Sequence, residues 1–160
     1  MPPIGATDAR LLILGSLPGD ESIRQQRYYA HPQNQFWRIV CAVFDEPFCE
    51  GDTERHALLQ RHGIAVWDVL KSAERLGSLD TAIKAPQPNA LAAFLRTQPN
   101  IGAIGFNGQK AAALFKGHIR PKLSANSAAI PAVILPSTSP AAAGLKLDDK
   151  IVRWRAFLRA

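Results

Sequence analysis

The stretch LLILGSLPG, residues 11–19, decides the fold. Its apolar residues Leu11 to Leu14 have the composition of a strand buried on both faces, and the chain then turns at once through Gly15 and the Pro18-Gly19 pair. A polar and aromatic stretch, YYAHPQNQFW at 28–37, follows and leads into a helix. Because ligands bind at the carboxyl ends of strands in an open α/β sheet, we expect chemistry at this turn.

The composition is that of a globular protein with a basic surface. Apolar residues make up 47% of the 160 residues and charged residues 20%, which suits one domain spanning 1–160 with a core of its own. The formal net charge of +6 favours a polyanionic partner. Basic residues cluster in three groups: Arg24, Arg27 and Arg38, then Lys116, Arg120 and Lys122, then Lys146, Lys150, Arg153, Arg155 and Arg159.

No metal site or cofactor is predicted. Two cysteines, Cys41 and Cys49, are too few for an iron–sulfur cluster or an all-cysteine zinc site, and the four histidines show no paired metal-ligand spacing. Cys41 lies on an apolar helical stripe, which predicts a small buried hydrophobe, and a disulfide to Cys49 is compatible with the spacing but not required. No signal peptide or bilayer-spanning run is found, so we expect a cytoplasmic protein without a membrane partner.

Apolar runs and turn residues predict alternating strands and helices. We expect strands at 10–15, 64–69, 101–106 and 132–135, and helices at 52–62, 88–96, 108–115 and 145–158. A further helix is expected to carry Pro32 in its first turn, with Phe36 and Trp37 on its buried face. The stretch through 76–80 reads as loop-rich, and 117–131 as irregular. This alternation predicts an α/β fold, a three-layer α/β/α sandwich around a central four-stranded parallel sheet.

Each predicted strand ends in a polar cluster. Taken singly, the clusters have ordinary explanations, because several are typical of helix caps and a lone carboxylate suits a solvated loop. Their coincidence at one edge of a parallel sheet favours a single composite site. The clusters are Ser16 with Pro18-Gly19, Asp68, Asn107-Gly108, and Ser137-Thr138-Ser139 with Pro140.

Several common chemistries do not fit these motifs. GSLPG at 15–19 is not a dinucleotide-binding G-x-G-x-x-G, because Leu17 stands where the second glycine is needed, and it is not a G-x-S-x-G nucleophile elbow. The chain has no Gly-Lys-Ser/Thr of a phosphate-binding P-loop. A small-molecule hydrolase with Ser16 or Ser137 as nucleophile lacks a placed histidine–acid pair.

Three segments, in this order, resemble the uracil-DNA glycosylase superfamily, and within it the hypoxanthine-DNA glycosylase branch. The resemblance implies a parallel four-stranded sheet between helices and a monofunctional enzyme without a cofactor. Such an enzyme flips a deaminated base out of double-stranded DNA and hydrolyses its glycosidic bond with water. The segments are GSLPGDESIRQQRYYAHPQNQFWRIV at 15–40, the region from VWDVL to RLGSLD at 66–80, and LPSTSPAAA at 135–143, with FNGQKA at 106–111 before the last.

Two positions depart from the patterns of other branches. Mismatch-specific relatives carry a water-positioning Asn where this chain has Leu17, and uracil-specific enzymes carry an Asp there and a His where it has Leu135. The resemblance to the hypoxanthine branch moves the catalytic role to Asn34, the Asn of HPxN. It therefore favours a purine such as hypoxanthine as the substrate, with uracil or xanthine as the alternatives within the same class of enzyme.

The expected mechanism assigns a role to each remaining candidate. Asn34 would orient a water toward a sugar that becomes oxocarbenium-like, while backbone amides of residues 16–19, the turn that contains Leu17 and Pro18, would donate to the departing base. Asp68 would accept a hydrogen bond from N1–H of hypoxanthine, and either backbone amides or Asn107 would donate one to its O6. Tyr28, Tyr29 and Phe36 are candidates for stacking on the base; packing is preferred for Phe36 and Trp37, and stacking for one of the two tyrosines.

The segment after the fourth strand is expected to meet the DNA. Ser137 and Ser139 would contact phosphates or line the loop, and residues 138–143, with Thr138 and Pro140, form the candidate wedge that fills the space of the flipped base. His31 would either cap its helix or touch a phosphate. A noncatalytic nucleic-acid-binding module that retains the fold is the alternative, because the usual side chains are missing at Leu17 and Leu135. We expect a monomer.

Overall fold

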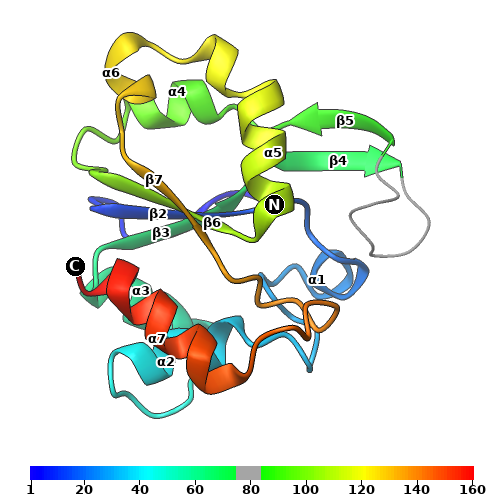
Figure 1. Cartoon of the computed structure of the whole chain (residues 1–160), viewed down its shortest axis with the longest axis vertical. Coiled ribbons are helices and arrows are strands. Elements are labelled where there is room, and N and C mark those ends of the chain that lie inside the picture. Colours follow the sequence, from blue (N-terminus) through cyan, green and yellow to red (C-terminus); the bar gives the residue numbers. More distant parts are fainter. Residues whose placement is uncertain (75–83) are drawn as a thin grey trace.

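The computed structural model describes residues 1–74 and 84–160 and confirms the three-layer sandwich (Figure 1). A sheet lies between two layers of helices, with α2, α3 and α7 on one face and α4, α5 and α6 on the other. The helices are α1 (Asp20–Gln25), α2 (Phe36–Val43), α3 (Asp52–Arg61), α4 (Leu91–Arg96), α5 (Gln109–His118), α6 (Ala125–Ala128) and α7 (Leu147–Leu158).

The central sheet contains the four predicted parallel strands and one strand more. Its order is β1-β3-β2-β6-β7, in which β3, β2, β6 and β7 run parallel and β1 is antiparallel to β3. The expectation of four strands was therefore one short, since the two residues of β1 are too few to show any period. The strands are β1 (Ile4–Gly5), β2 (Leu11–Gly15), β3 (Ile64–Asp68), β6 (Ala103–Asn107) and β7 (Ala132–Leu135).

The core forms because helices cover both faces of the middle strands. All five residues of β2 and all five of β3 are buried, as their continuous apolar sequences require. On the helical side, α2 turns Phe36 and its neighbours inward, and the Trp154 ring of α7 meets Phe36 edge to face at 5.8 Å. Each fully buried side chain of this size contributes roughly 1.5–3 kcal/mol from burial.

A second, two-stranded sheet replaces part of a predicted helix. Strands β4 (Leu70–Glu74) and β5 (Lys84–Pro88) pair antiparallel with two irregularities of register. The helix expected from Pro88 therefore begins later, at Leu91. Prolines are poor strand residues, so the two prolines of β5 hid the strand from sequence reasoning. The stretch through 76–80, expected to be loop-rich, lies outside the described residues.

Two smaller expectations change as well. The region 117–131, expected to be irregular, contains the end of α5, a short 3₁₀ turn at Arg120–Lys122 and α6. Cys41 is buried, as predicted, and it and Cys49 are both free thiols. Burial raises the pKa of the Cys41 thiol to about 11. Within the described residues, no helix has the length and apolar character needed to cross a membrane.

Candidate active site

The four parallel strands end at one edge of the sheet, as predicted. Gly15, the last residue of β2, is the register partner of Asp68, the last residue of β3. Asn107 ends β6 opposite Leu135, which ends β7. Parallel register thus delivers residues from four distant parts of the chain to one place.

A cavity of about 160 Å³, open to solvent, lies at this edge. It is lined by most of the candidate residues named from the sequence, but not by Phe36, Gly108 or the end of the candidate wedge, 141–143. Five lining residues were not candidates: Met1, Gly15, Asp20, Glu21 and Ser22. The predicted lining residues are Ser16, Leu17, Pro18, Gly19, Tyr28, Tyr29, His31, Asn34, Asp68, Asn107, Ser137, Thr138, Ser139 and Pro140.

Gly15 lets two polar groups approach the end of β2. A Cβ atom on Gly15 would lie 2.4 Å from Asp68 Oδ1 and 2.9 Å from Tyr29 Oη, distances that no side chain tolerates. Asp68 is buried, and its backbone carbonyl accepts a hydrogen bond of 2.8 Å from Asn89 Nδ2. Glycine at 15 is therefore needed for the Asp68 carboxylate and the Tyr29 hydroxyl to occupy this end of the cavity.

The two tyrosines differ in what surrounds them. Tyr28 is 5% exposed and donates to Pro2 O at 2.6 Å. Burial, together with the nearby Asp68 charge, raises the pKa of Tyr28 far above its ordinary value, so its phenol stays neutral. Tyr29 is only partly buried and has a left-handed backbone with φ of 55°. Of the two, Tyr29 is better placed to offer a ring face to a ligand.

Phe36 supports Tyr29 from behind instead of lining the cavity. Its ring is fully buried and stacks on the Tyr29 ring, with 4.1 Å between centroids and 22° between planes. Trp37 meets the Phe36 ring edge to face at 4.9 Å, and Trp37 Nε1 donates to Tyr28 O at 2.9 Å. Phe36 and Trp37 thus pack in the core, as expected from the sequence. Because Phe36 is fully buried, it cannot contact a base directly.

Asn34 precedes α2, because the helix does not carry Pro32 in its first turn as expected. Pro32 sits in a separate turn, and the helix begins at Phe36. Asn34 Oδ1 accepts a hydrogen bond of 2.9 Å from the Phe36 backbone N–H. Because that N–H needs an acceptor, the orientation of the Asn34 amide is fixed: the oxygen keeps one lone pair, and the NH₂ group remains a donor.

His31 takes part in the same turn. Its Nδ1 accepts from Gln33 N at 3.1 Å, and its carbonyl accepts from Asn34 N at 2.9 Å. His31 therefore stabilises a turn ahead of α2 and does not cap the helix itself, as one of the two alternatives held, while its exposed ring lines the cavity.

Asn107 and Thr138 bind each other, which changes the expectation for both. Asn107 Nδ2 donates to Thr138 Oγ1 and Thr138 N donates to Asn107 Oδ1, each at 2.9 Å. Thr138 is completely buried, so its side chain cannot reach a DNA duplex. Asn107 retains one N–H for a ligand, and its main role is to hold the segment after β7. Ser137 and Ser139 stabilise that segment through hydrogen bonds to the backbone N–H groups of Ser139 and Ala141.

The two unusual leucines have different surroundings. Leu17 lines the cavity, whereas Leu135 is 3% exposed and does not. A Cβ atom at Gly105 would lie 2.9 Å from Leu135 Cδ1, which places the Leu135 side chain in the sheet core. The absence of a histidine at 135 therefore leaves no vacancy in the cavity wall.

The cavity is acidic. Three acidic residues, Asp20, Glu21 and Asp68, are among its lining residues, and no lysine or arginine is among those that the structure describes. The hydrogen bond from Arg24 holds the pKa of Glu21 below its ordinary value, so Glu21 stays ionised at neutral pH. Acidic walls stabilise a cation inside the cavity. The described ranges hold no group of three or more His, Cys, Asp or Glu arranged to bind a metal ion.

Comparison with known proteins gives the same family for nearly the whole chain. The model of the uracil DNA glycosylase superfamily matches residues 2–158. A hypoxanthine DNA glycosylase from Methanosarcina barkeri (strain Fusaro / DSM 804) is 40% identical over 110 residues, 68% of this chain and 70% of that protein. A second, from Methanosarcina acetivorans, is 39% identical over 111 residues, 69% of this chain and 70% of that protein.

A solved structure agrees with these relatives. The solution NMR structure of a candidate uracil DNA glycosylase from Methanosarcina acetivorans superimposes with a TM-score of 0.83 at 32% identity, covering 99% of this chain and 94% of that one. The chain therefore belongs to the uracil DNA glycosylase superfamily.

Proposed function

We propose that this DNA glycosylase excises a deaminated base from double-stranded DNA, with hypoxanthine as its preferred base. The observation that carries the proposal is the fixed Asn34 amide on the wall of an acidic cavity, next to the strand ends that hold Asp68. Two relatives that share about 40% of their aligned residues with this chain are named hypoxanthine DNA glycosylases, which supports an enzyme over a noncatalytic module.

The chemistry needs a held water and a stabilised sugar cation. Cleavage of the glycosidic bond leaves positive charge on the deoxyribose and negative charge on the departing base. Asn34 would accept one hydrogen bond from the water through the free lone pair of Oδ1 and so direct its oxygen to the anomeric carbon. The carboxylates of the cavity wall would lower the energy of the sugar cation, so a strong general base is not needed.

Base recognition would use the polar groups near Gly15. The Asp68 carboxylate is an acceptor suited to N1–H of hypoxanthine, and the backbone amides of the 16–19 turn would donate to the base as charge develops on it. Tyr29, supported by Phe36, would stack on the flipped base, a contact worth roughly 1–3 kcal/mol in nucleic-acid binders. Ser137, Ser139 and Pro140 would meet the DNA at the cavity mouth.

A substrate panel tests the proposal. Duplexes that differ only in one base (hypoxanthine, uracil or xanthine) are incubated with excess protein and then treated with alkali to cleave abasic sites. We expect hypoxanthine to be released fastest. Faster release of uracil or xanthine would overturn the preference, and salt-dependent DNA binding without release of any base would support the noncatalytic alternative.

A further inference from the structure

Lys150 of α7 is a buried cation that the proposed chemistry does not use. Its side chain belongs to a residue only 3% exposed, and burial lowers the pKa of its ammonium group from the ordinary value. Lysine is almost never buried this deeply without hydrogen-bond partners, because removing its charge from water costs free energy. The hydrogen bonds that offset this cost show which segments of the chain Lys150 connects.

Two hydrogen-bond acceptors of Lys150 belong to segments that border the cavity. Lys150 Nζ donates to Gln35 Oε1 at 3.0 Å and to the Ala142 carbonyl at 2.9 Å. Gln35 directly follows Asn34, and Ala142 lies in the segment after β7 that also contains Ser137 to Pro140. One ammonium group therefore connects the Asn34–Gln35 turn to the segment after β7, two segments that form walls of the cavity.

A backbone contact completes this connection. Gln35 N donates to Thr138 O at 3.0 Å, so Gln35 binds the segment after β7 through its backbone and binds Lys150 through its side chain. Trp154, one turn further along α7, donates from Nε1 to Pro136 O at 2.9 Å. Helix α7 thus holds the start of this segment through Trp154 and its end through Lys150.

We propose that Lys150 is a positioning residue for base release: it fixes the distance between the Asn34 turn and the segment from 137 to 142. This inference rests on the proposed role of Asn34. Hydrogen bonds from an ammonium group are about twice as strong as neutral ones, and more so where water is excluded, so the pair of contacts resists relative movement of the two walls. Displacement of a reacting group by about 1 Å costs on the order of 100-fold in rate.

The test replaces Lys150 by an uncharged side chain of similar length. Lys150→Met keeps the packing volume and removes both hydrogen bonds. Arg153→Met is the matched control, because Arg153 lies on the same helix, carries the same charge and is exposed. Single-turnover base release is measured with excess protein, together with the dissociation constant for the same duplex and circular dichroism at the assay temperature.

We expect Lys150→Met to remain folded and to bind the duplex within about three-fold of the wild-type affinity, while its release rate falls at least about ten-fold. Arg153→Met should keep a rate within about two-fold of the wild type. An unchanged rate in Lys150→Met, with Asn34→Ala inactive, would overturn the inference and leave the proposed function intact.

A second measurement does not depend on base release. Amide hydrogen exchange followed by mass spectrometry should show peptides covering 34–36 and 136–143 exchanging faster in Lys150→Met by about ten-fold or more, with no such change in Arg153→Met. Unchanged protection in both peptides would show that Lys150 does not hold the two walls together, whatever base the protein releases.

A double variant separates positioning through Gln35 from a general effect on the helix. Gln35→Leu removes the acceptor, and we expect the double variant Gln35→Leu/Lys150→Met to lose no more rate than the worse of the two single variants. Losses that multiply would mean that the two residues act independently and would overturn the proposed route through Gln35.

Discussion

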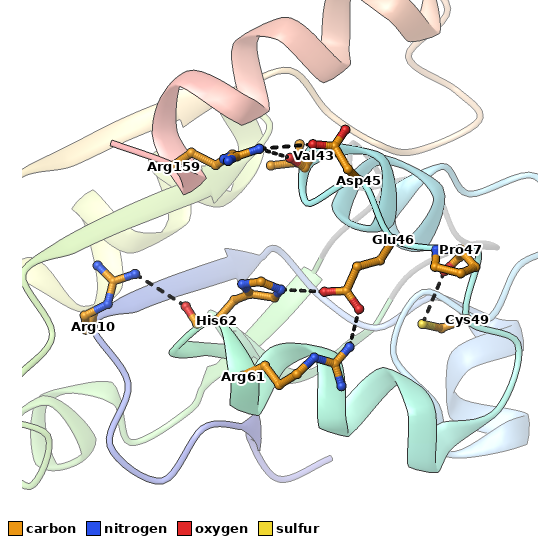
Figure 2. A network of polar contacts seen from close by, with 9 residues as sticks. All are labelled: Arg10, Val43, Asp45, Glu46, Pro47, Cys49, Arg61, His62 and Arg159. Carbon is orange, nitrogen blue, oxygen red and sulfur yellow. Dashed lines mark hydrogen bonds and ion pairs between the residues drawn. The ribbon is translucent and has the colours of Figure 1, made fainter.

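The two edges of the parallel sheet use charge in different ways. At the amino edge, the Glu46 carboxylate binds Arg61 and His62, with 2.6 Å between Glu46 Oε2 and His62 Nε2 (Figure 2). The His62 ring also stacks on Phe44 at 3.6 Å, and Arg10 Nη2 donates to the His62 carbonyl at 3.5 Å. The Glu46 carboxylate, its two basic partners and the Phe44 ring thus bind one another, and these contacts connect α3 to the loop after α2.

At the carboxyl edge, the acids lie in the wall of a cavity. Asp20, Glu21 and Asp68 are among its lining residues, and Arg24, which is not a lining residue, forms an ion pair with Glu21. We therefore expect the amino-edge network to stabilise the fold and the cavity at the carboxyl edge to bind the ligand. Variants of the first should change stability and spare activity, and variants of the second should mainly change activity.

The largest expected effect is at Asn34. Asn34→Ala should reduce base release by at least about 100-fold, because the water loses its orienting group. The helix α2 also loses the acceptor for Phe36 N–H, at a cost of about 1 kcal/mol in unfolding free energy. Gln33→Ala, at the exposed neighbouring position, is the control and should keep the wild-type rate. Full activity in Asn34→Ala would remove this residue from the mechanism.

The next effect is at Gly15. Gly15→Ala places a Cβ 2.4 Å from Asp68 Oδ1, so the carboxylate must move, and we expect a loss of about 10- to 100-fold in single-turnover rate. Gly117→Ala is the matched control: this helical glycine has no atom within 4 Å of the added Cβ, so the variant should gain about 0.5–1 kcal/mol in stability and keep its rate. Equal rates in the two variants would contradict the importance of the Asp68 position.

A smaller effect is expected at Asp68 itself. Asp68→Asn keeps the shape and an acceptor oxygen but removes a negative charge from the cavity, which should lower the release rate of hypoxanthine about ten-fold. Asp148→Asn, at an exposed position in α7, should leave the rate unchanged. If both variants release hypoxanthine at the wild-type rate, the charge of Asp68 does not stabilise the sugar cation.

The smallest effect belongs to the amino edge. The His62 hydrogen bond, and after it Arg61, lowers the pKa of Glu46 from its ordinary value of 4.5. The resulting stabilisation is complete above pH 4.5 and is lost as the pH falls through the lower folded-state pKa. Glu46→Gln should therefore unfold more easily at pH 7, by less than about 1 kcal/mol because the group is near the surface, and the difference should vanish in acid.

Chemical unfolding at both pH values measures this effect, and base release from the same preparations should be unchanged. A large loss of activity in Glu46→Gln would contradict the expectation that the amino edge of the sheet affects stability but not activity.

The strand ends were predictable because their signals are local and strong. Four apolar runs, each followed by glycine, proline or a polar cluster, are enough to place the ends of four parallel strands at one edge. This reasoning found nearly the whole cavity wall. It could not find Met1, because the wall position of that residue depends on β1, and it missed Asp20 and Glu21 because the six residues DESIRQ of α1 lack an apolar stripe.

Other errors came from side-chain contacts that sequence does not reveal. A proline suggested a helix start at residue 32, but the helix begins at Phe36, whose backbone N–H donates to the Asn34 side chain. Asn107 and Thr138 looked like separate ligand-binding groups, 31 residues apart, yet they bind each other. Pairings of this kind depend on the final packing of β6 against β7, which no local pattern encodes.

The position of Met1 matters for how the protein is prepared. Its carbonyl accepts from Trp67 Nε1 at 2.9 Å, and the residue lines the cavity, whereas Ala160 lies at the opposite edge of the sheet (Figure 1). An affinity tag fused ahead of Met1 would emerge beside the entrance of the cavity. It would then compete with the DNA for that space. A tag attached after Ala160 would leave the entrance clear.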